Sequence, residues 1–276
     1  MTTLLNKTAV VTGAGSGIGR ALAIELAKQG CQLAISDINV SGLQATKQGI
    51  LDIAPKAVVH IYELDVANRA SMLDYATLVH AELGDIHLVI NNAGVALSSG
   101  LDDTKREDFE WLMNINFWGV VNGTEAFLPF LKQAQGGGHV VNISSVFGMI
   151  AIPRQSSYNA AKFAVRGYTE ALRQEMCLNH NNIEVSCVHP GGIATEIVQN
   201  ARISDGEDRA ELSQSFDKLA HTTPEKAAKI IVAGIKKNKP RIMVGWDAHV
   251  IHVLVRLLGI RYISLTQWLA KRLNYQ

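Results

Sequence analysis

Short apolar runs alternate with longer segments of helical period along the chain. Apolar residues three and four apart predict helices over 18–29, 41–52, 69–83, 107–133, 155–180 and 224–236. The apolar runs between them predict strands at 9–12, 32–36, 58–63, 87–91, 139–143, 184–189 and 241–244. Strands that alternate with helices form parallel sheets covered on both faces. We therefore expect a single α/β domain, built on a doubly wound sheet of about seven parallel strands flanked by helices.

The composition indicates a large hydrophobic core and a net charge close to zero. Of the 276 residues 47% are hydrophobic and 18% are charged, and the mean hydropathy is +0.10. A formal net charge of +1 argues against a nucleic acid partner, because no basic field is available to bind a phosphate backbone. A small-molecule ligand is a better expectation.

The cysteines and the start of the chain bear on location. Cys31, Cys177 and Cys187 have the spacing of neither a disulfide framework nor a zinc site, which favours a reducing compartment and no metal. Residues 1–8 lack the basic and apolar stretches of an export signal. Nowhere do 18 uncharged apolar residues follow one another, so no membrane-spanning helix is expected. These features predict a cytoplasmic protein.

A glycine-rich turn follows the first predicted strand. Its residues include Gly13, Ser16, Gly17, Ile18 and Gly19, and a predicted helix begins within it. Glycine lets the backbone turn tightly beside a pyrophosphate, and the first amides of the helix favour negative charge. An isolated match of this kind could be a flexible loop, but a strand before it and a helix after it favour a dinucleotide site.

Asp37 ends the second predicted strand, 24 residues after Gly13, where an acid that binds the adenosine ribose is expected. Its carboxylate could accept both ribose hydroxyls and would repel a 2′-phosphate. No arginine in the turn, at Ile38 or at Asn39 would offset that repulsion. We therefore predict NAD rather than NADP as the cofactor; the alternative is an ordinary turn aspartate.

The ends of the third and fourth predicted strands offer further cofactor contacts. Asp65 could accept a hydrogen bond from the adenine amino group, and Val66 could pack on the ring. Asn92, Ala93 and Gly94 are small or polar and would let the cofactor pass close to the backbone. Each short motif is common in loops, so their value lies in their positions at neighbouring strand ends.

Tyr158 and Lys162 lie four residues apart, on one face of a predicted helix. A phenol with a pKa of about 10 needs nearby positive charge to act as a base at neutral pH, and Lys162 could supply it. Ser145 follows the strand 139–143 and could bind the substrate oxygen. Asn116 lies inside a long apolar helix, where a buried amide needs partners. It could serve a site or occupy a helix kink in the core.

Taken in order, TGxxxGxG at 12–19, NNAG at 91–94, the serine, YxxxK at 158–162 and the turn at 190–191 resemble the classical short-chain dehydrogenase/reductase family over roughly residues 8–245. The resemblance implies a Rossmann-type fold with Tyr158 as general acid/base and Ser145 orienting the carbonyl. It also implies that Lys162 binds the nicotinamide ribose and lowers the tyrosine pKa, and that Asn116 holds a proton-relay water.

The family pattern and the strand ends together imply a cofactor site and a substrate site. The substrate residues are Ser145, Phe147 and Tyr158. In the turn after the sixth strand, the Ile193 backbone and the Thr195 side chain would meet the nicotinamide. The expected cofactor contacts are Gly13, Ser16, Gly17, Ile18, Gly19, Asp37, Ile38, Asp65, Val66, Asn92, Ala93, Gly94, Ile115, Tyr158, Lys162, Pro190, Gly191, Ile193 and Thr195.

These residues predict an NAD(H)-dependent oxidoreductase that moves hydride between the nicotinamide and a carbonyl or secondary alcohol. Apolar segments at 95–97, 146–147, 149–152 and 197–198 favour a lipophilic substrate, and 196–221 has the length and polarity of a lid or of a surface insertion. A non-catalytic NAD sensor or scaffold is the alternative. A sugar-nucleotide epimerase or dehydratase is disfavoured, because such relatives usually need a larger C-terminal region.

The catalytic domain is expected over 1–247, followed by a helical extension over 248–276. After Asp247 no acidic residue occurs, and Arg256, Arg261, Lys271 and Arg272 are interleaved with apolar residues. This pattern fits helices packed on the domain or on a neighbouring subunit, and it also fits a basic amphipathic contact with a membrane. The family resemblance implies a homotetramer or homodimer formed through the helices at 107–133 and 155–180.

Overall fold

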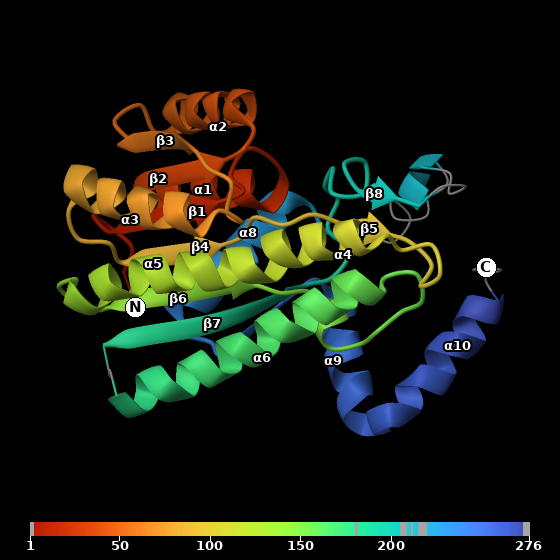
Figure 1. Ribbon diagram of the computed structural model, residues 1–276. Coiled ribbons are helices and arrows are strands. Elements are labelled where there is room, and N and C mark those ends of the chain that lie inside the picture. Colours follow the sequence, from red (N-terminus) through yellow and green to blue (C-terminus); the bar gives the residue numbers. More distant parts are fainter. Residues whose placement is uncertain (1–2, 180–181, 205–208, 211, 215–219, 273–276) are drawn as a thin grey trace.

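The computed structural model describes residues 3–179, 182–204, 209–210, 212–214 and 220–272, and within them seven strands form one parallel sheet (Figure 1). The predicted doubly wound sheet is confirmed. Its central strands are buried on both faces and rich in valine and isoleucine, as expected of a sheet between two helical layers. The order is β3-β2-β1-β4-β6-β7-β9, with β1 (Thr8–Thr12), β2 (Gln32–Asp37), β3 (Val59–Glu63), β4 (Leu88–Asn91), β6 (Gly138–Ile143), β7 (Ile183–Pro190) and β9 (Arg241–Val244).

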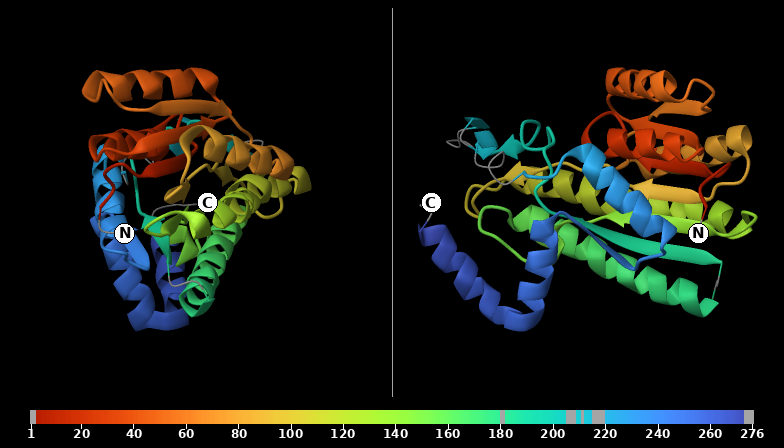
Figure 2. Two further views of the ribbon diagram at one scale, coloured as in Figure 1. Left: turned by 90° about the vertical axis from the view of Figure 1, so that its left-hand side faces the viewer. Right: turned by 180° about the vertical axis from the view of Figure 1, so that it is seen from behind.

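Helices cover both faces of the sheet, which lies between them in the left view of Figure 2. One face carries α1 (Gly17–Lys28), α2 (Val40–Ile53) and α8 (Pro224–Lys236), and its core includes Leu22, Leu26 and Ile231. The other face packs around Phe127 and Met72. Its helices are α3 (Arg69–Leu83), α4 (Arg106–Met113), α5 (Gly119–Gln133) and α6 (Ser156–Asn179).

The strand order creates a crevice at the carboxyl ends of β1 and β4. The chain leaves β1 for β2 on one side, and β4 lies on the other side, so the loops after β1 and β4 diverge. Ligands of doubly wound sheets bind at such a switch point. The expected cofactor residues after these two strands therefore share one edge of the sheet.

The long helix predicted over 107–133 is interrupted. Between α4 and α5 the residues Asn114–Trp118 form a π-helical turn, in which the Gly119 amide bonds to the Asn114 carbonyl. Apolar periodicity continues through this turn, so the sequence pattern did not reveal it. Turns of this kind are frequent at functional sites.

Two further differences concern short elements. A small parallel sheet joins β5 (Leu97–Ser98) to β8 (Arg202–Ile203), and two-residue strands are too short to produce an alternating pattern. The helix predicted over 155–180 ends at Asn179, and residue 180 is outside the described residues. The other predicted boundaries agree within two residues.

The C-terminal helices leave the body of the molecule as a bent arm (Figures 1 and 2). We define the arm as α9 (Trp246–Leu258), the 3₁₀ turn η3 (Gly259–Arg261) and α10 (Tyr262–Arg272). Its root packs through Ala248 against Met243 and Val146. Farther out, the Tyr262 hydroxyl accepts a hydrogen bond from the Ala151 amide at 3.3 Å. The arm therefore touches the segment that follows β6.

One segment near the C-terminus has the length and composition of a membrane-spanning helix, although the search for uncharged apolar runs predicted none. Trp246–Trp268 is long and apolar enough by length and composition, and only 6% of its most apolar window is buried. The search for uncharged runs missed it because Arg256 and Arg261 interrupt it. However, the bend at Gly259 leaves α9 with 13 residues, about 20 Å, whereas a bilayer core is about 30 Å thick.

Candidate active site

The glycine turn after β1 has the backbone of a phosphate cradle. Gly13 and Gly17 have φ values of +66° and +51°, in the region that favours glycine. A Cβ atom on Gly19 would lie 2.0 Å from the Gly13 carbonyl oxygen, so the turn and α1 pack too closely for any side chain there. Ser16 is the N-cap residue of α1, and its side chain forms no capping hydrogen bond with the described residues. Its first amides are therefore available to an external acceptor such as a pyrophosphate.

Side chains from two neighbouring elements hold this turn in place. The Thr12 hydroxyl accepts hydrogen bonds from the Asn92 and Ala93 amides at 3.0 and 3.1 Å. The Asn92 side chain donates to the carbonyls of Thr12 and Gly13 at 2.9 and 3.1 Å. Asn92, expected as a cofactor contact, thus ties β4 to the turn. Its side chain shapes the crevice.

Arg20, in the first turn of α1, contacts the glycine turn and was not revealed by the motifs. Its guanidinium donates to the Gly15 carbonyl and, through Nε, to the Thr46 hydroxyl at 3.1 Å. Thr46 in turn donates to the Ala14 carbonyl at 2.8 Å. The sequence signal was an arginine directly after the last glycine of the turn, although its partner on α2 could not be known from sequence.

Asp37 lies against the glycine turn at the end of β2. Its two carboxylate oxygens accept hydrogen bonds from the Gly15 and Asn39 amides, each at 2.9 Å. The next residue, Ile38, has an exposed side chain. The structure therefore brings a negative charge to the edge of the crevice, beside the position expected for an adenosine ribose.

Asp65 and Val66 follow β3 and face different surroundings. Asp65 is exposed and accepts a hydrogen bond from the Ala67 amide at 2.9 Å. Val66 is buried against α5, where a Cβ on Gly119 would lie 2.6 Å from a Val66 methyl group. Its carbonyl accepts a hydrogen bond from Asn122 at 3.0 Å. The lack of a side chain at Gly119 thus makes room for Val66.

Tyr158 and Ser145 meet where β6 ends and α6 begins. Ser145 is buried at the start of the 3₁₀ turn η2 (Val146–Gly148), and Tyr158 is half-buried in the first turns of α6. The ring of Phe147 meets the Tyr158 ring edge-on, with 6.2 Å between centroids. Burial raises the pKa of Tyr158 to about 12, and a hydrogen bond with Ser145 acts in the opposite direction.

Lys162 lies one helical turn below the phenol and is almost fully buried. Its ammonium is 5.6 Å from the Tyr158 ring centroid and donates to the Ile143 carbonyl at 3.1 Å. Burial lowers the pKa of Lys162 to about 8, so the ammonium form prevails at neutral pH. In the protein without cofactor, burial has the largest effect on the pKa of the Tyr158 phenol.

Asn116 is fully buried in the π-helical turn and pairs with the backbone of Val95. Its amide accepts from the Val95 N–H and donates to the Val95 carbonyl, both at 2.8 Å. A Cβ on Gly94 would lie 3.1 Å from Asn116 Oδ1 and 3.6 Å from Lys162 Nζ. The structure thus brings together Asn116, Gly94 and Lys162. The neighbouring Ile115 is half-buried against the core.

The turn after β7 lies opposite the glycine turn. Ile193 is buried and forms a parallel bridge with Thr222. A Cβ on Gly17 would lie 3.3 Å from the Thr195 methyl group, so the two turns approach each other across the crevice. Pro190 closes β7, and a Cβ on Gly191 would lie 2.0 Å from an Asp247 carboxylate oxygen.

Asp247 is a second residue that the motifs did not reveal. Its carboxylate accepts a hydrogen bond from the Gly192 amide at 2.7 Å and so ties the first turn of α9 to the turn after β7. The only sequence signal was an acid two residues after Gly245, in the first turn of a helix. The C-terminal arm is therefore connected to the candidate cofactor site at its root.

Apolar side chains surround the phenol. Tyr158 packs against a buried cluster of Leu97, Leu112 and Ala161, and Val95 and Trp111 pack against the same cluster. A cavity of about 630 Å³ adjoins the start of α6, between the loop at 100–101 and the segment 151–156. Among the described residues, no group of three or more His, Cys, Asp or Glu side chains is placed to hold a metal ion.

Comparisons with known proteins agree with this geometry. A family model described as short chain dehydrogenase matches residues 7–206. The "Putative oxidoreductase SadH" of Mycobacterium tuberculosis is 50% identical over 266 residues, which cover 96% of this chain and 95% of that protein.

Two solved structures share the fold. A short chain dehydrogenase/reductase from Burkholderia phymatum in complex with NAD aligns with a TM-score of 0.85 and 28% identity, over 96% of each chain. An alcohol dehydrogenase from the archaeon Thermococcus sibiricus, complexed with 5-hydroxy-NADP, aligns with a TM-score of 0.72 and 25% identity, over 86% of this chain and 95% of that chain. This chain belongs to the short-chain dehydrogenase/reductase family of oxidoreductases, which bind a nicotinamide cofactor on a Rossmann-type fold.

Proposed function

We propose that this protein is an NAD(H)-dependent oxidoreductase that interconverts a carbonyl compound and a secondary alcohol, with Tyr158 as the general acid/base. The observation that carries the proposal is the meeting of the Tyr158 phenol with the Ser145 hydroxyl and the buried Lys162 ammonium. The nicotinamide, when bound, supplies or accepts the hydride. The protein supplies position, a proton and electrostatics.

Each polar residue of the site has its own role in the proposed reaction. The Ser145 hydroxyl donates a hydrogen bond to the substrate oxygen and orients it. Tyr158 gives its phenolic proton to that oxygen in the reductive direction and takes it back in the oxidative direction. Burial keeps the phenol protonated at neutral pH, which is the form needed to reduce a carbonyl. Lys162 would hold the nicotinamide ribose, and Asn116 would hold a proton-relay water.

The cofactor would be held along the whole crevice. The amides of the glycine turn bind the pyrophosphate, and Asp37 binds the adenosine ribose. Ala93, Gly94, Ile193 and Thr195 line the path to the nicotinamide. Because the two solved relatives carry NAD and an NADP derivative, the fold alone does not select the cofactor. We infer NAD from the carboxylate of Asp37, which would repel a 2′-phosphate.

The substrate is proposed to be lipophilic, and the segment 196–221 of the catalytic domain (1–247) is proposed to cover it. Tyr158 and Trp111 pack against the same apolar cluster, which includes Leu97. Arg202 lies over the Trp111 ring at 3.8 Å and pairs with Asp108 at 2.7 Å. These contacts seat part of the segment on α4, next to the phenol. Parts of 196–221 are outside the described residues.

Replacing Tyr158 by phenylalanine tests the mechanism. General acid catalysis contributes about 10²- to 10⁴-fold, so Tyr158→Phe should lose at least about 100-fold in turnover while still binding NADH. Wild-type protein is first screened with aliphatic, aromatic, steroid and acyl carbonyls by loss of NADH absorbance. NADH binding is followed by fluorescence.

Tyr168→Phe is the matched control, because Tyr168 lies on the same helix and its ring packs on Phe117 away from Ser145. It should keep wild-type turnover. Near-normal turnover in Tyr158→Phe would contradict the mechanism. Wild-type protein that binds NADH and reduces no carbonyl would point to the sensor or scaffold function.

We also propose that the C-terminal arm binds an anionic membrane surface. The exposed residues Trp246, Val250, Val253 and Leu257 recur at helical spacing on one face of α9, and Arg256 lies on the neighbouring face. No acidic residue follows Asp247, so two arms packed together would bring like charges close to each other. An interfacial helix has this combination of apolar and basic faces.

For assembly we propose a homodimer or homotetramer formed through α5 and α6. Trp118 and Phe163 are exposed large side chains at the start of α5 and on α6. Burial of such residues against a second copy is a common source of association energy.

A further inference from the structure

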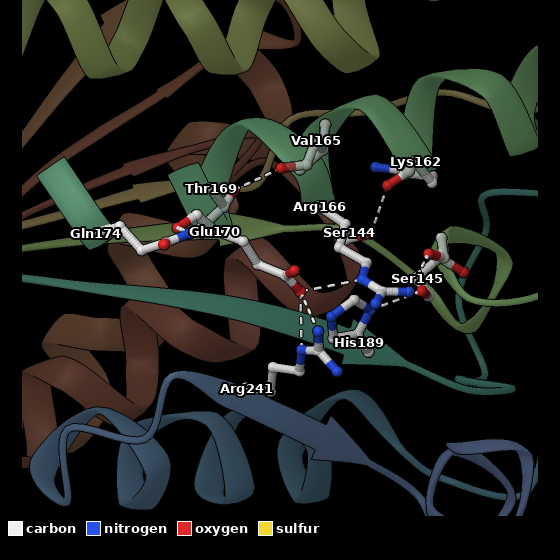
Figure 3. A network of polar contacts seen from close by, with 11 residues as sticks. Ser144, Ser145, Lys162, Val165, Arg166, Thr169, Glu170, Gln174, His189 and Arg241 are labelled. Atoms are coloured by element: carbon white, nitrogen blue, oxygen red, sulfur yellow. Dashed lines mark hydrogen bonds and ion pairs between the residues drawn. The ribbon is translucent and has the colours of Figure 1, made fainter. Parts of the chain in front are cut away.

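Three side chains form hydrogen bonds that fix the turn carrying Ser145 and its approach to α6 (Figure 3). The Ser144 hydroxyl donates to the Lys162 carbonyl at 2.8 Å. His189 Nδ1 lies 2.9 Å from the Ser145 carbonyl oxygen. The Arg166 guanidinium donates to the Gly148 carbonyl at 3.3 Å. The His189 and Arg166 bonds end on backbone carbonyls of the turn, and the Ser144 bond joins the start of the turn to the backbone of α6. These side chains therefore help to determine the path of the turn.

His189 is the contact that reaches Ser145 itself. It lies at the end of β7, where the Ser144 amide bonds to the Val188 carbonyl, and it is fully buried. A carbonyl oxygen can only accept, so Nδ1 carries the proton of this hydrogen bond. Burial lowers the pKa of His189 to about 4, which leaves the ring neutral at pH 7. Its Nε2 has no hydrogen-bond partner among the described residues.

A buried ring nitrogen without a partner is unfavourable, and an apolar residue would avoid it. The single bond that His189 does make therefore needs an explanation other than core stability. Its partner is the residue whose hydroxyl meets the phenol. That hydroxyl oxygen also accepts the Phe147 amide at 3.1 Å, so its position depends on the orientation of the peptide after Ser145.

The far end of the same turn is held by an ionic network. Arg166 Nε contacts a Glu170 carboxylate oxygen at 3.0 Å, and Arg241 Nε contacts the same oxygen at 2.8 Å. Two guanidinium groups on one carboxylate fix Arg166 against the Gly148 carbonyl. The Ser145 carbonyl accepts two hydrogen bonds, one from the Gly148 amide at 3.0 Å within the turn and one from His189 at 2.9 Å. His189 is therefore the contact that holds this carbonyl from outside the turn.

We propose that His189 is a positioning residue for the proposed reaction: its neutral Nδ1–H holds the Ser145 carbonyl and thereby aims the Ser145 hydroxyl at the reacting oxygen. The inference rests on the proposed function of Ser145. His189 itself would touch neither the substrate nor the cofactor. Its effect should therefore appear in turnover and not in cofactor affinity.

Two substitutions at His189 separate the donor from the bulk of the side chain. His189→Asn keeps an N–H group near the position of Nδ1, whereas His189→Leu has similar size and no donor. With a carbonyl substrate from the screen, His189→Leu should lower kcat by roughly 10- to 100-fold, because small misplacements of reacting groups have effects of that order. NADH affinity and KM should stay near wild type. His189→Asn should restore most of kcat.

His139→Leu is the matched control for burial. His139 lies on the adjacent strand β6, is also fully buried, and bonds to the Ser186 hydroxyl at 2.8 Å, away from the turn. It should lower the unfolding temperature and leave kcat unchanged. Equal losses of kcat in His139→Leu and His189→Leu would overturn the inference, as would a wild-type kcat in His189→Leu or a failure of His189→Asn to restore it.

A second measurement does not depend on activity. Imidazole ¹⁵N spectra of the wild-type protein at pH 7, assigned with His189→Asn, should show a neutral ring protonated at Nδ1. An Nε2–H tautomer or a charged ring would overturn the inference even if the oxidoreductase function holds. Conversely, a neutral Nδ1–H ring in a protein without carbonyl turnover would mean that the proposed function has failed and that His189 supports the turn for another purpose.

Discussion

At the scale of single residues, burial determines the protonation of the groups at the site. It raises the pKa of Tyr158 and lowers the pKa of Lys162, because loss of water disfavours the charged form of each. Burial is therefore the main cause of both pKa shifts. The Asp37 carboxylate, at the crevice edge, acts instead through its charge.

Cofactor choice is the prediction that belongs to Asp37. Wild-type protein should bind NADH more tightly than NADPH, and Asp37→Ala should narrow that ratio by about tenfold, equivalent to about 1.4 kcal/mol. Affinity for NADH falls, because the ribose loses its acceptor, and NADPH is no longer repelled. Titrations followed by NADH and NADPH fluorescence measure both affinities.

Asp65→Ala provides the comparison, since Asp65 follows the neighbouring strand β3 and accepts a hydrogen bond from the Ala67 amide. It should change the two affinities by similar factors. A wild-type protein that prefers NADPH would show that the assignment of NAD is wrong.

At the scale of elements, the site depends on close approaches between turns and helices. The π-helical turn gives Asn116 its access to the Val95 backbone, and the glycine turn lets α1 begin directly after β1. Neither arrangement tolerates much added volume. The tightest example is Gly19, packed on the carbonyl of Gly13.

Gly19→Ala should therefore disrupt the turn. A methyl group 2.0 Å from a carbonyl oxygen forces α1 away from β1. We expect loss of NADH binding and destabilisation by about 1–3 kcal/mol, the range for overpacking. Chemical denaturation and NADH fluorescence would measure these effects.

Gly167→Ala is the control, because Gly167 lies within α6 and a Cβ there meets nothing within 4 Å. Alanine is the better helix former by up to about 1 kcal/mol, so this variant should be neutral or more stable and bind NADH normally. Unchanged NADH affinity in Gly19→Ala would mean that the glycine turn does not hold the cofactor.

At the scale of the whole molecule, the sheet and its two helical layers form one body from which the arm extends (Figure 1). Exposed apolar residues on the arm, such as Leu257 at 77% exposure, have no core of their own to enter. A partner surface is the simplest means of covering them. Asp247 at its root belongs to the catalytic body, because it binds the turn after β7.

Removal of residues 248–276 tests the proposed membrane contact and leaves Asp247 in place. Full-length protein should sediment with vesicles that contain phosphatidylglycerol and much less with phosphatidylcholine vesicles, and salt should weaken the binding. The truncated protein should remain in the supernatant. Leu257→Asp, at an exposed position, should weaken binding without loss of fold.

Sedimentation of the truncated protein with the same vesicles would exclude the arm as the anchor. Gel filtration of both proteins identifies the alternative. A change from oligomer to monomer on truncation, without vesicle binding by the full-length chain, would show that the arm contacts a second subunit.

Much of this fold could be predicted because its signals are local. Buried strands such as β6 are continuous apolar runs, and helices such as α3 end at a glycine, here Gly84. Their bounds therefore followed from apolar spacing and local end signals. Gly13 and Gly17 indicated a turn because few other residues adopt its backbone. The order of the motifs was enough to indicate the family and the residues expected at the site.

Contacts between distant segments could not be obtained in this way. Arg20 reaches Thr46, Asp247 reaches Gly192 and His189 reaches Ser145 across separations that no periodic pattern records. The π-helical turn preserves apolar spacing and so gives no local signal. The sequence by itself determined where the main helices and strands form and which chemical groups follow them, because backbone propensity and apolar spacing act locally. Only the tertiary structure determined which of these groups meet and how deeply each is buried. Depth of burial in turn sets the protonation state of each titratable group.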